Sequence, residues 1–344
     1  MKILILGVNG FIGHHLVNRI LAKKKDWIVY GMDLGTDRLG KSLDNPNFHF
    51  MEGDIAINRE WIELQIKKCD VIMPLVAIAT PKLYVEDPIA VYNLDFEMNV
   101  DIIKKCVKYH KRVVFPSTSE VYGTCSDPEF KEDESFLVVG PINKERWIYS
   151  CCKQLLDRVI YGYGTRGHLE FTLFRPFNWI GPKLDSLNTA KEGSSRVVTQ
   201  FIAELFMKRP INLVDGGKQK RCFTYVDDGI DALMKILENK NDVCKNQIIN
   251  IGNPENECSI KELAHILKKQ FKQHPDHKND KTYSDIIDTS ADKFYGKGYQ
   301  DIYTRKPSIE KARKLLNWEP KIGLEESMRL TLNSFLKENK NAKI

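Results

Sequence analysis

The sequence predicts an α/β protein with a doubly wound parallel sheet of the Rossmann type, followed by a smaller C-terminal lobe. Three observations support this fold class. Apolar strand-like runs alternate with helical runs, a turn with regularly spaced glycines follows the first run, and the regular alternation of strands and helices ends after Pro176. The 344 residues also exceed a typical domain with one core. We expect residues 1–175 to form the sheet domain, with a return segment near 212–250, and residues 176–344 to form mainly the second lobe.

Short apolar runs mark the predicted strands of the sheet, and stretches with apolar residues at helical spacing separate them. The strand-like runs cover residues 2–7, 26–34, 48–55, 69–77, 112–119 and 170–178. The helical stretches cover residues 11–24, 61–68, 97–110 and 150–164. Strands that alternate with helices connect through right-handed crossovers, which predicts one parallel sheet covered on both faces.

Beyond Pro176 the predicted elements are more mixed. Strands are expected at residues 211–215, 222–228 and 247–253, and helices at residues 194–208, 228–239, 259–271, 307–318 and 323–338. Ser259 and Glu262 have the spacing of a capping box, which predicts a helix start. The polar residues 272–293 show no periodic pattern, and we expect them to form a mobile excursion.

Composition and charge exclude several classes of function. The formal charge of +6 comes from scattered lysines, so no nucleic-acid partner is expected. No apolar run is long enough to span a membrane, and a strand pattern at residue 2 leaves no room for a signal peptide before it, which predicts a cytoplasmic protein without a membrane partner. The eight cysteines have no C-x-x-C spacing, so we expect free thiols and no metal site.

A turn rich in glycine follows the first predicted strand. Gly7, Gly10 and Gly13 in GVNGFIG stand where the chain passes from strand to helix, and Phe11 and Ile12 belong to the start of that helix. Glycines there let the backbone approach a pyrophosphate at the positive end of the helix. The spacing alone is weak, but the strand before it, the helix after it and an acidic residue downstream together predict a dinucleotide site.

Asp33, at the end of the second predicted strand, is that acidic residue. A carboxylate there accepts hydrogen bonds from a ribose 2′-hydroxyl and repels a 2′-phosphate, so it favours NAD over NADP, although Arg38 follows closely. Asp54, after the third strand, is placed either to reach the adenine edge or to make a turn. Ala77, after the fourth strand, is small enough to let the cofactor lie across the sheet edge.

The fifth predicted strand ends in FPSTSEVYG, which brings Thr118, Ser119 and Glu120 to the edge where ligands bind in this architecture. Tyr149 and Lys153 follow four positions apart, so they lie on the same face of a helix. An ammonium group beside a tyrosine favours the phenolate and lets it act as a base near neutral pH. Many surface helices carry such a pair, but together with the hydroxyls and the glycine turn it predicts a nicotinamide-dependent oxidoreductase.

These motifs resemble those of the extended short-chain dehydrogenase/reductase family, which has a G-x-x-G-x-x-G turn, a serine or threonine after the fifth strand and a Y-x-x-x-K pair. The resemblance spans nearly the whole chain. Within the family, the chain is similar to the decarboxylase domain of ArnA-type enzymes, without their formyltransferase domain. The phrases that carry this similarity are PSTSEVYG, VGPINKERWIYS, FTLFRPFNWIGP, GSSR, DGGKQKRCFT, INIGNPENE and YGKGYQD.

The resemblance implies oxidation of UDP-glucuronic acid at carbon 4 by NAD, followed by loss of CO2 to give UDP-4-keto-pentose and NADH. Tyr149 would take the hydroxyl proton, and the resulting β-keto acid would lose its carboxylate readily. Glu120 would act in acid/base chemistry near carbon 5. Ser119 replaces the aspartate of sugar-nucleotide dehydratases, which removes the acid that expels a hydroxyl. Arg305 in TRKPS would assist decarboxylation; apart from the resemblance, its position indicates only a loop cation.

The resemblance also implies residues for the nucleotide end of the substrate. Asn178, Arg196 and Arg221 would hold the phosphates and uridine of a UDP-sugar, and Tyr299 would line the sugar pocket. Asn212 departs from the pattern, which has a lysine at this position. The contact at the nucleotide is therefore expected to differ from that of the ArnA-type enzymes.

Three alternatives to this function remain open. A decarboxylase of the UDP-xylose synthase type would return the hydride to carbon 4, and another enzyme would use a UDP-uronic acid with an N-acetyl group at carbon 2. A nucleotide-sensing pseudoenzyme would not turn over, but such relatives usually lose the catalytic tyrosine or lysine, and both are present. Because the family commonly dimerises through the helix at residues 97–110 and the Tyr149 helix, a homodimer is expected.

Overall fold

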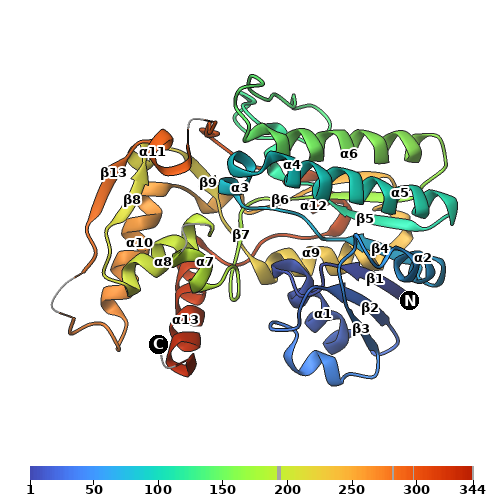
Figure 1. Cartoon of the computed structure of the whole chain (residues 1–344), viewed down its shortest axis with the longest axis horizontal. Helices are drawn as coiled ribbons and strands as arrows, with labels where there is room; N and C mark the ends of the chain where they lie inside the picture. Colours follow the sequence, from blue (N-terminus) through green and yellow to red (C-terminus); the bar gives the residue numbers. More distant parts are fainter. Residues whose placement is uncertain (192–194, 281–282, 297, 343–344) are drawn as a thin grey trace.

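The computed structural model describes residues 1–191, 195–280, 283–296 and 298–342 (Figure 1). A seven-stranded sheet lies at its centre, in the order β11-β6-β5-β4-β1-β2-β3, and every neighbouring pair is parallel. The predicted doubly wound parallel α/β sheet is therefore confirmed. Its strands are β1 (Lys2–Leu6), β2 (Ile28–Asp33), β3 (Phe48–Glu52), β4 (Val71–Pro74), β5 (Arg112–Pro116), β6 (Phe171–Pro176) and β11 (Gln247–Ile251).

Alternate residues of the central strands point to opposite faces of the sheet, and helices cover both faces (Figure 1). In β1, Ile3 and Ile5 belong to the core beneath α1 and α9, whereas Leu4 and Leu6 belong to the core beneath α2, α5 and α6. These helices are α1 (Phe11–Lys23), α2 (Arg59–Lys68), α5 (Asn99–Lys108), α6 (Trp147–Thr165) and α9 (Val226–Glu238). Burial on both faces explains why the strands read as continuous apolar runs.

Between β4 and α5 the chain forms short helical pieces that the sequence did not indicate. They are α3 (Pro81–Glu86), α4 (Pro88–Tyr92) and the π-helical segment η2 (Asn93–Met98). After β5 a 3-10 turn, η3 (Ser119–Tyr122), leads away from the sheet. Both connections start at the carboxyl edge of the sheet, where the predicted site residues lie.

Among the described residues, the second half of the chain forms three two-stranded sheets. The smaller lobe is on the left of Figure 1. β7 pairs with β10 and β8 with β13 in parallel, whereas β9 and β12 are antiparallel. The strands are β7 (Trp179–Ile180), β8 (Ile211–Val214), β9 (Lys220–Cys222), β10 (Thr224–Tyr225), β12 (Glu257–Ser259) and β13 (Ile286–Thr289). The helices are α7 (Leu187–Lys191), α8 (Val197–Phe206), α10 (Ile260–Gln273), α11 (Ala291–Tyr295), α12 (Glu310–Leu316) and α13 (Leu324–Ala342).

The capping box at the start of α10 is confirmed. The Ser259 hydroxyl accepts the backbone N–H of Glu262, and the Glu262 carboxylate accepts the backbone N–H of Ser259 at 2.7 Å. Each partner satisfies a donor that would otherwise lack one at the helix end. In the part of the chain that the structure describes, no helix is long and apolar enough to cross a membrane.

Two sequence expectations differ from the structure. The strand expected at residues 222–228 stops at Tyr225, and α9 begins at Val226, because acidic side chains in its first turn favour a helix start. The excursion expected at residues 272–293 contains β13 and α11. Backbone pairing with β8 makes β13 a strand despite its polar sequence, and residues 281–282 lie outside the described ranges.

Candidate active site

The glycine turn between β1 and α1 leaves no space for side chains. Gly7 has φ +87°, and a Cβ on it would lie 3.0 Å from backbone atoms of Leu75 and Val76. A Cβ on Gly13 would lie 2.3 Å from the carbonyl oxygen of Gly7 and 2.8 Å from the Cα of Val8. The turn is therefore tight, and it packs directly against the chain that leaves β4.

Helix α1 starts at Phe11, and Gly10 before it is extended and offers no side-chain cap. The N–H groups of the first helical turn, including those of Phe11 and Ile12, have no carbonyl partner within the helix. The positive end of the helix and these donors suit a diphosphate, and the missing side chains let it come close. The residues at this turn thus fit the pyrophosphate of a dinucleotide.

We expect Gly13→Ala to weaken NAD binding by about tenfold or more, because the turn must shift to make room for the Cβ and its N–H groups then move away from the pyrophosphate position; tenfold corresponds to about 1.4 kcal/mol. Isothermal titration calorimetry with NAD would measure the change. Gly323→Ala is the matched control, since a Cβ on Gly323 meets nothing within 4 Å. Equal affinities of the two variants would contradict the assignment of this turn to the cofactor.

Asp33 is the last residue of β2 and is tied to the glycine turn. Its Oδ2 accepts the backbone N–H of Asn9 at 2.7 Å, and its Oδ1 accepts that of Leu34 at 2.8 Å. Burial raises the pKa of Asp33, and these hydrogen bonds together with nearby Arg38 oppose the rise. The carboxyl group is therefore held beside the turn at the edge of the sheet, and its contact with a ribose stays a prediction.

Asp54 and Ala77 lie on the chain that leaves β3 and β4. The Oδ1 of Asp54 accepts the backbone N–H of Ala56 at 2.8 Å, so the side chain stabilises a local turn. Ala77 is half-buried, and the N–H of the next residue, Ile78, donates to Asp95 at 2.7 Å. The turn expected of Asp54 is present, and its contact with adenine stays a prediction.

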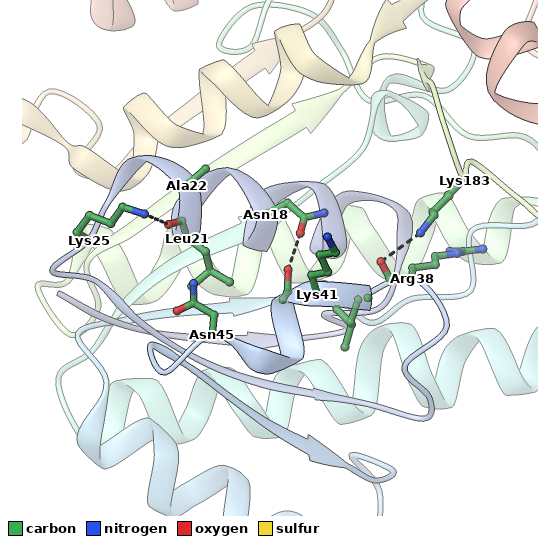
Figure 2. A pocket seen from close by; sticks show the side chains of 11 residues that line it. Asn18, Leu21, Ala22, Lys25, Arg38, Lys41, Asn45 and Lys183 are labelled. Carbon is green, nitrogen blue, oxygen red and sulfur yellow. Dashed lines mark hydrogen bonds between the residues drawn. The ribbon is translucent and has the colours of Figure 1, made fainter. Parts of the chain in front are cut away.

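A depression of about 490 Å³ lies between α1 and the segment of residues 38–45 (Figure 2). Four cationic residues line it: Lys25, Arg38, Lys41 and Lys183. Figure 2 shows Lys183 reaching from a distant segment to the carbonyl oxygen of Arg38, at 3.3 Å. The glycines of the turn and Asp33 are not among its lining residues, so it borders the cofactor residues without containing them.

Tyr149 and Lys153 lie one turn apart on α6, and both are buried, with 6% and 1% of their surface exposed. The Lys153 ammonium is 5.9 Å from the centroid of the Tyr149 ring and donates to the carbonyl oxygen of Pro116 at 3.1 Å. The Tyr149 ring stacks on Tyr84 with centroids 4.7 Å apart. The pair is therefore held within the protein, next to the end of β5.

The electrostatic surroundings favour the protonated form of Tyr149. Burial raises its pKa well above the ordinary range, the carboxylates of Asp95 and Glu120 raise it further, and a hydrogen bond with Thr118 opposes them. Burial lowers the pKa of Lys153, and Asp95 opposes this by favouring the ammonium. The phenol therefore needs added positive charge, such as that of an oxidised nicotinamide, to act as a base.

The residues that follow β5 lie beside the Tyr149–Lys153 pair. Thr118 caps η3, and its hydroxyl accepts the backbone N–H of Glu120 at 3.2 Å. The hydroxyl of Ser119 accepts a long hydrogen bond of 3.5 Å from Arg305. The structure thus brings Thr118, Ser119, Glu120 and Arg305 together, although Arg305 comes from a distant part of the chain.

Glu120 is the centre of a buried charge cluster. Its Oε2 accepts from Nη2 of Arg146 at 2.6 Å, and its Oε1 accepts from Nη1 of Arg305 at 2.5 Å. Burial alone would raise the pKa of Glu120, but the two arginines outweigh it and lower the pKa to about 2. Within the described residues, Nε of each arginine and Nη1 of Arg146 have no hydrogen-bond partner. These free donors are suited to a further anion.

Tyr299 adjoins this cluster, and its place in a sugar pocket stays a prediction. It is 7% exposed, and its ring stacks on Tyr295 with centroids 4.0 Å apart. The guanidinium carbon of Arg146 lies 5.6 Å from the centroid of the Tyr299 ring. Tyr299 and Arg146 therefore share one wall of the site.

Arg196 links the second half of the chain to the cofactor turn. Its Nη2 donates to Oδ1 of Asp185 at 2.7 Å, and its guanidinium carbon lies 5.3 Å from the ring centroid of Phe11. It also lowers the pKa of Tyr149, against the larger effect of burial. Arg196 is thus near both the predicted pyrophosphate site and the predicted base.

Arg221 and Asn178 are engaged with the chain itself. Arg221 donates through Nη2 to Oδ1 of Asp301 at 2.6 Å and through Nη1 to the carbonyl of Ile302 at 2.7 Å. Asn178 donates to the carbonyl of Cys222 at 3.3 Å. Both Nη atoms of Arg221 are therefore engaged with the chain, and these contacts hold its guanidinium in place.

A comparison with protein families identifies the chain. A family model described as NAD dependent epimerase/dehydratase family matches residues 3–252. The chain belongs to this family. Its cofactor is NAD, as the glycine turn and Asp33 predicted, and the predicted resemblance is confirmed at the level of the family.

Solved structures of the family have the same fold. The PbgP3 protein from Burkholderia pseudomallei is 53% identical over 99% of this chain and 98% of that one, with a TM-score of 0.89. A UDP-glucuronic acid 4-epimerase from Bacillus cereus is 22% identical over 98% and 100%, with a TM-score of 0.79. A dTDP-glucose 4,6-dehydratase from Bacillus anthracis is 22% identical over 99% and 98%, with a TM-score of 0.78.

Sequence reasoning missed two residues of this epimerase/dehydratase site. Arg146 shares Glu120 with Arg305, and Tyr84 supports the Tyr149 ring. A cation three positions before the tyrosine, in KERWIY, was the available signal for Arg146, whereas nothing local marks Tyr84. In the described ranges, no group of three or more His, Cys, Asp or Glu side chains is placed to hold a metal ion.

Proposed function

We propose that the chain catalyses the NAD-dependent oxidative decarboxylation of UDP-glucuronic acid to UDP-4-keto-pentose, with release of NADH and CO2. The observation that carries this proposal is the contact of Arg305 with both Ser119 and Glu120. Oxidation needs a base, an ammonium and a hydroxyl, whereas buried arginines with free donors add a site for a substrate carboxylate. That combination is the one expected from the resemblance to the ArnA-type decarboxylase domain.

Bound NAD supplies the acceptor for the hydride that leaves carbon 4. Tyr149 takes the hydroxyl proton, Lys153 stabilises the phenolate, and Thr118 and Ser119 hold the substrate oxygen in line. The ketone makes the sugar a β-keto acid, and its carboxylate leaves as CO2 because the electron pair is delocalised into an enolate. The same hydroxyls stabilise that enolate. The proton that carbon 5 then accepts balances the proton that Tyr149 removed.

The charge state of Glu120 limits its role. With its pKa lowered to about 2 by Arg146 and Arg305 against burial, Glu120 is a carboxylate at neutral pH. A carboxylate with so low a pKa is a weak base, so Glu120 is suited mainly to orient Arg305, and it could deliver the proton that carbon 5 accepts only after leaving both arginines and taking up a proton itself. The partner-free donors of the two arginines, defined within the described residues, would bind the substrate carboxylate.

In this proposal residues 1–175, with the return segment near 212–250, bind NAD, and residues 176–344 mainly bind the sugar nucleotide. Arg196 is the strongest candidate for the diphosphate, because it lies near the cofactor turn and is partly exposed. Arg221 and Asn178 would contribute alongside their present contacts with the chain. Asn212, which donates to the carbonyl of Pro210 at 3.3 Å, would replace a cationic contact with a neutral one.

Incubation of the purified protein with UDP-glucuronic acid and NAD tests the proposal. We expect equal amounts of NADH and CO2, measured by absorbance and trapping, and a product with the mass of a UDP-4-keto-pentose. CO2 without net NADH would instead indicate a UDP-xylose synthase type. Turnover only with a 2-N-acetylated UDP-uronic acid would indicate that substrate. NAD binding without turnover of any uronic acid would indicate a nucleotide-sensing pseudoenzyme.

We also propose a homodimer formed through α5 and α6. Leu155, on α6, is 48% exposed, and an interface through this helix would cover its apolar side chain. Sedimentation analysis at micromolar concentration is expected to show a dimer that Leu155→Glu weakens. A monomeric wild type would contradict the proposal.

A further inference from the structure

Asp95 is a buried acid that the proposed mechanism does not use. It lies in the π-helical segment η2 and is 0% exposed. Its Oδ1 accepts the backbone N–H of Ile78 at 2.7 Å, whereas its Oδ2 has no hydrogen-bond partner among the described residues. A buried carboxylate oxygen without a partner is unfavourable, and single π-helical turns often occur at functional sites. Both features indicate a role beyond packing.

The hydrogen bond of Asp95 fixes Ile78, a residue that packs against the apolar cluster of Tyr149. Ile78 packs in an apolar cluster with Tyr84, Val91 and Tyr149. Because Ile78 follows directly after Ala77, the bond also fixes the chain that leaves β4 at the predicted cofactor edge. Asp95 therefore joins η2 to two parts of the proposed site.

Asp95 also faces α6, against which η2 packs. Among the described residues, the charge of Asp95 raises the pKa of four groups: the ammonium of Lys153, the thiol of Cys152 and the phenols of Tyr84 and Tyr149. Burial raises the pKa of Asp95 to about 6, and Lys153 opposes the rise. Near neutral pH Asp95 is thus mainly a carboxylate, which favours the ammonium and disfavours the phenolate.

We propose that Asp95 is a positioning residue for the Tyr149–Lys153 pair, which anchors Ile78 and sets, through its charge, the pH at which Tyr149 acts as a base. The inference rests on the proposed function, because it takes Tyr149 as the base. Asp157, four residues beyond Lys153 on α6, also favours the charged lysine. Lys153 therefore keeps one favourable carboxylate without Asp95, whereas Asp95 is the largest of the charge effects that raise the pKa of Tyr149.

Asp95→Asn tests the charge, because the amide oxygen can still accept the N–H of Ile78. With one negative charge removed, the phenolate becomes easier to form. We expect the acidic limb of the profile of kcat against pH to move to lower pH by roughly one unit. This is the lower end of the pKa shifts that a neighbouring charge causes. Glu97→Gln, an exposed carboxylate in the same segment, is the matched control and should leave the limb in place. A limb that stays or moves to higher pH in Asp95→Asn contradicts the inference.

A second measurement needs neither substrate nor cofactor. Urea unfolding of Asp95→Asn, Lys153→Met and the double variant should show non-additive stabilities, because the charge of Lys153 favours the buried Asp95 carboxylate and Lys153→Met removes that effect only when Asp95 is present. The pair Glu97→Gln and Lys153→Met should be additive. Additive stabilities for Asp95 and Lys153 would overturn the inference whatever the substrate is. If the Asp95 and Lys153 stabilities are non-additive but the protein does not turn over UDP-glucuronic acid, only the proposed function is contradicted.

Discussion

Tyr149→Phe is expected to lower kcat by about 10³-fold or more, because it removes the only atom of the side chain that can take the hydroxyl proton. The phenyl ring keeps the stack on Tyr84, whose plane is within 6° of that of Tyr149. Loss of the hydrogen bond with Thr118 should cost only about 1 kcal/mol of stability. The variant should therefore remain folded and bind NAD nearly as well as the wild type.

Single-turnover formation of NADH from UDP-glucuronic acid measures the chemical step in this variant, and calorimetry measures NAD binding. Tyr161→Phe is the matched control, since Tyr161 is on the same helix but is 50% exposed. The control should keep the wild-type rate. Full activity of Tyr149→Phe would remove the base from the proposed mechanism, whereas equal losses in both variants would point to damage of α6.

The parts of the site that come from one short stretch could be predicted from the sequence. The glycine turn, Asp33 at the end of β2, and the Tyr149–Lys153 pair all depend on residues within one strand, turn or helix. Their chemistry follows from local geometry: a helix places residues four apart on one face, and parallel strands end at one edge. The family comparison confirms the fold and the cofactor that these motifs indicated.

Contacts between distant segments could not be predicted from residue patterns. The hydrogen bond between Arg305 and Glu120 joins residues 185 positions apart, and that between Arg221 and Asp301 joins residues 80 apart. A sequence shows which side chains carry charge but not which of them share a partner. The resemblance, and not a residue pattern, assigned Arg221 to the nucleotide, which stays a prediction, and no local pattern indicated its ion pair with Asp301.

Glu120→Gln is expected to destabilise the protein by about 3 kcal/mol at neutral pH. The pKa of Glu120 is about 2 in the folded protein and 4.5 ordinarily, and this difference corresponds to about 3 kcal/mol of stabilisation. Loss of one partner of a buried ion pair costs about 3–5 kcal/mol. The variant leaves Arg146 and Arg305 buried without their shared counter-ion. Turnover should fall as well, because Arg305 loses the carboxylate that orients it toward Ser119.

The pH dependence of this stabilisation has a definite sign. Because the pKa of Glu120 is lower in the folded than in the unfolded protein, its contribution is complete above pH 4.5 and disappears as the pH falls toward 2. Urea unfolding of wild type and Glu120→Gln should therefore give curves that differ at pH 7 and converge in acid. Glu132→Gln is the opposite control: burial raises the pKa of Glu132, so removing its charge should leave stability at pH 7 unchanged or slightly higher. A Glu120→Gln variant as stable as Glu132→Gln at neutral pH would mean that the two arginines do not depend on Glu120, and the proposed carboxylate site would lose its support.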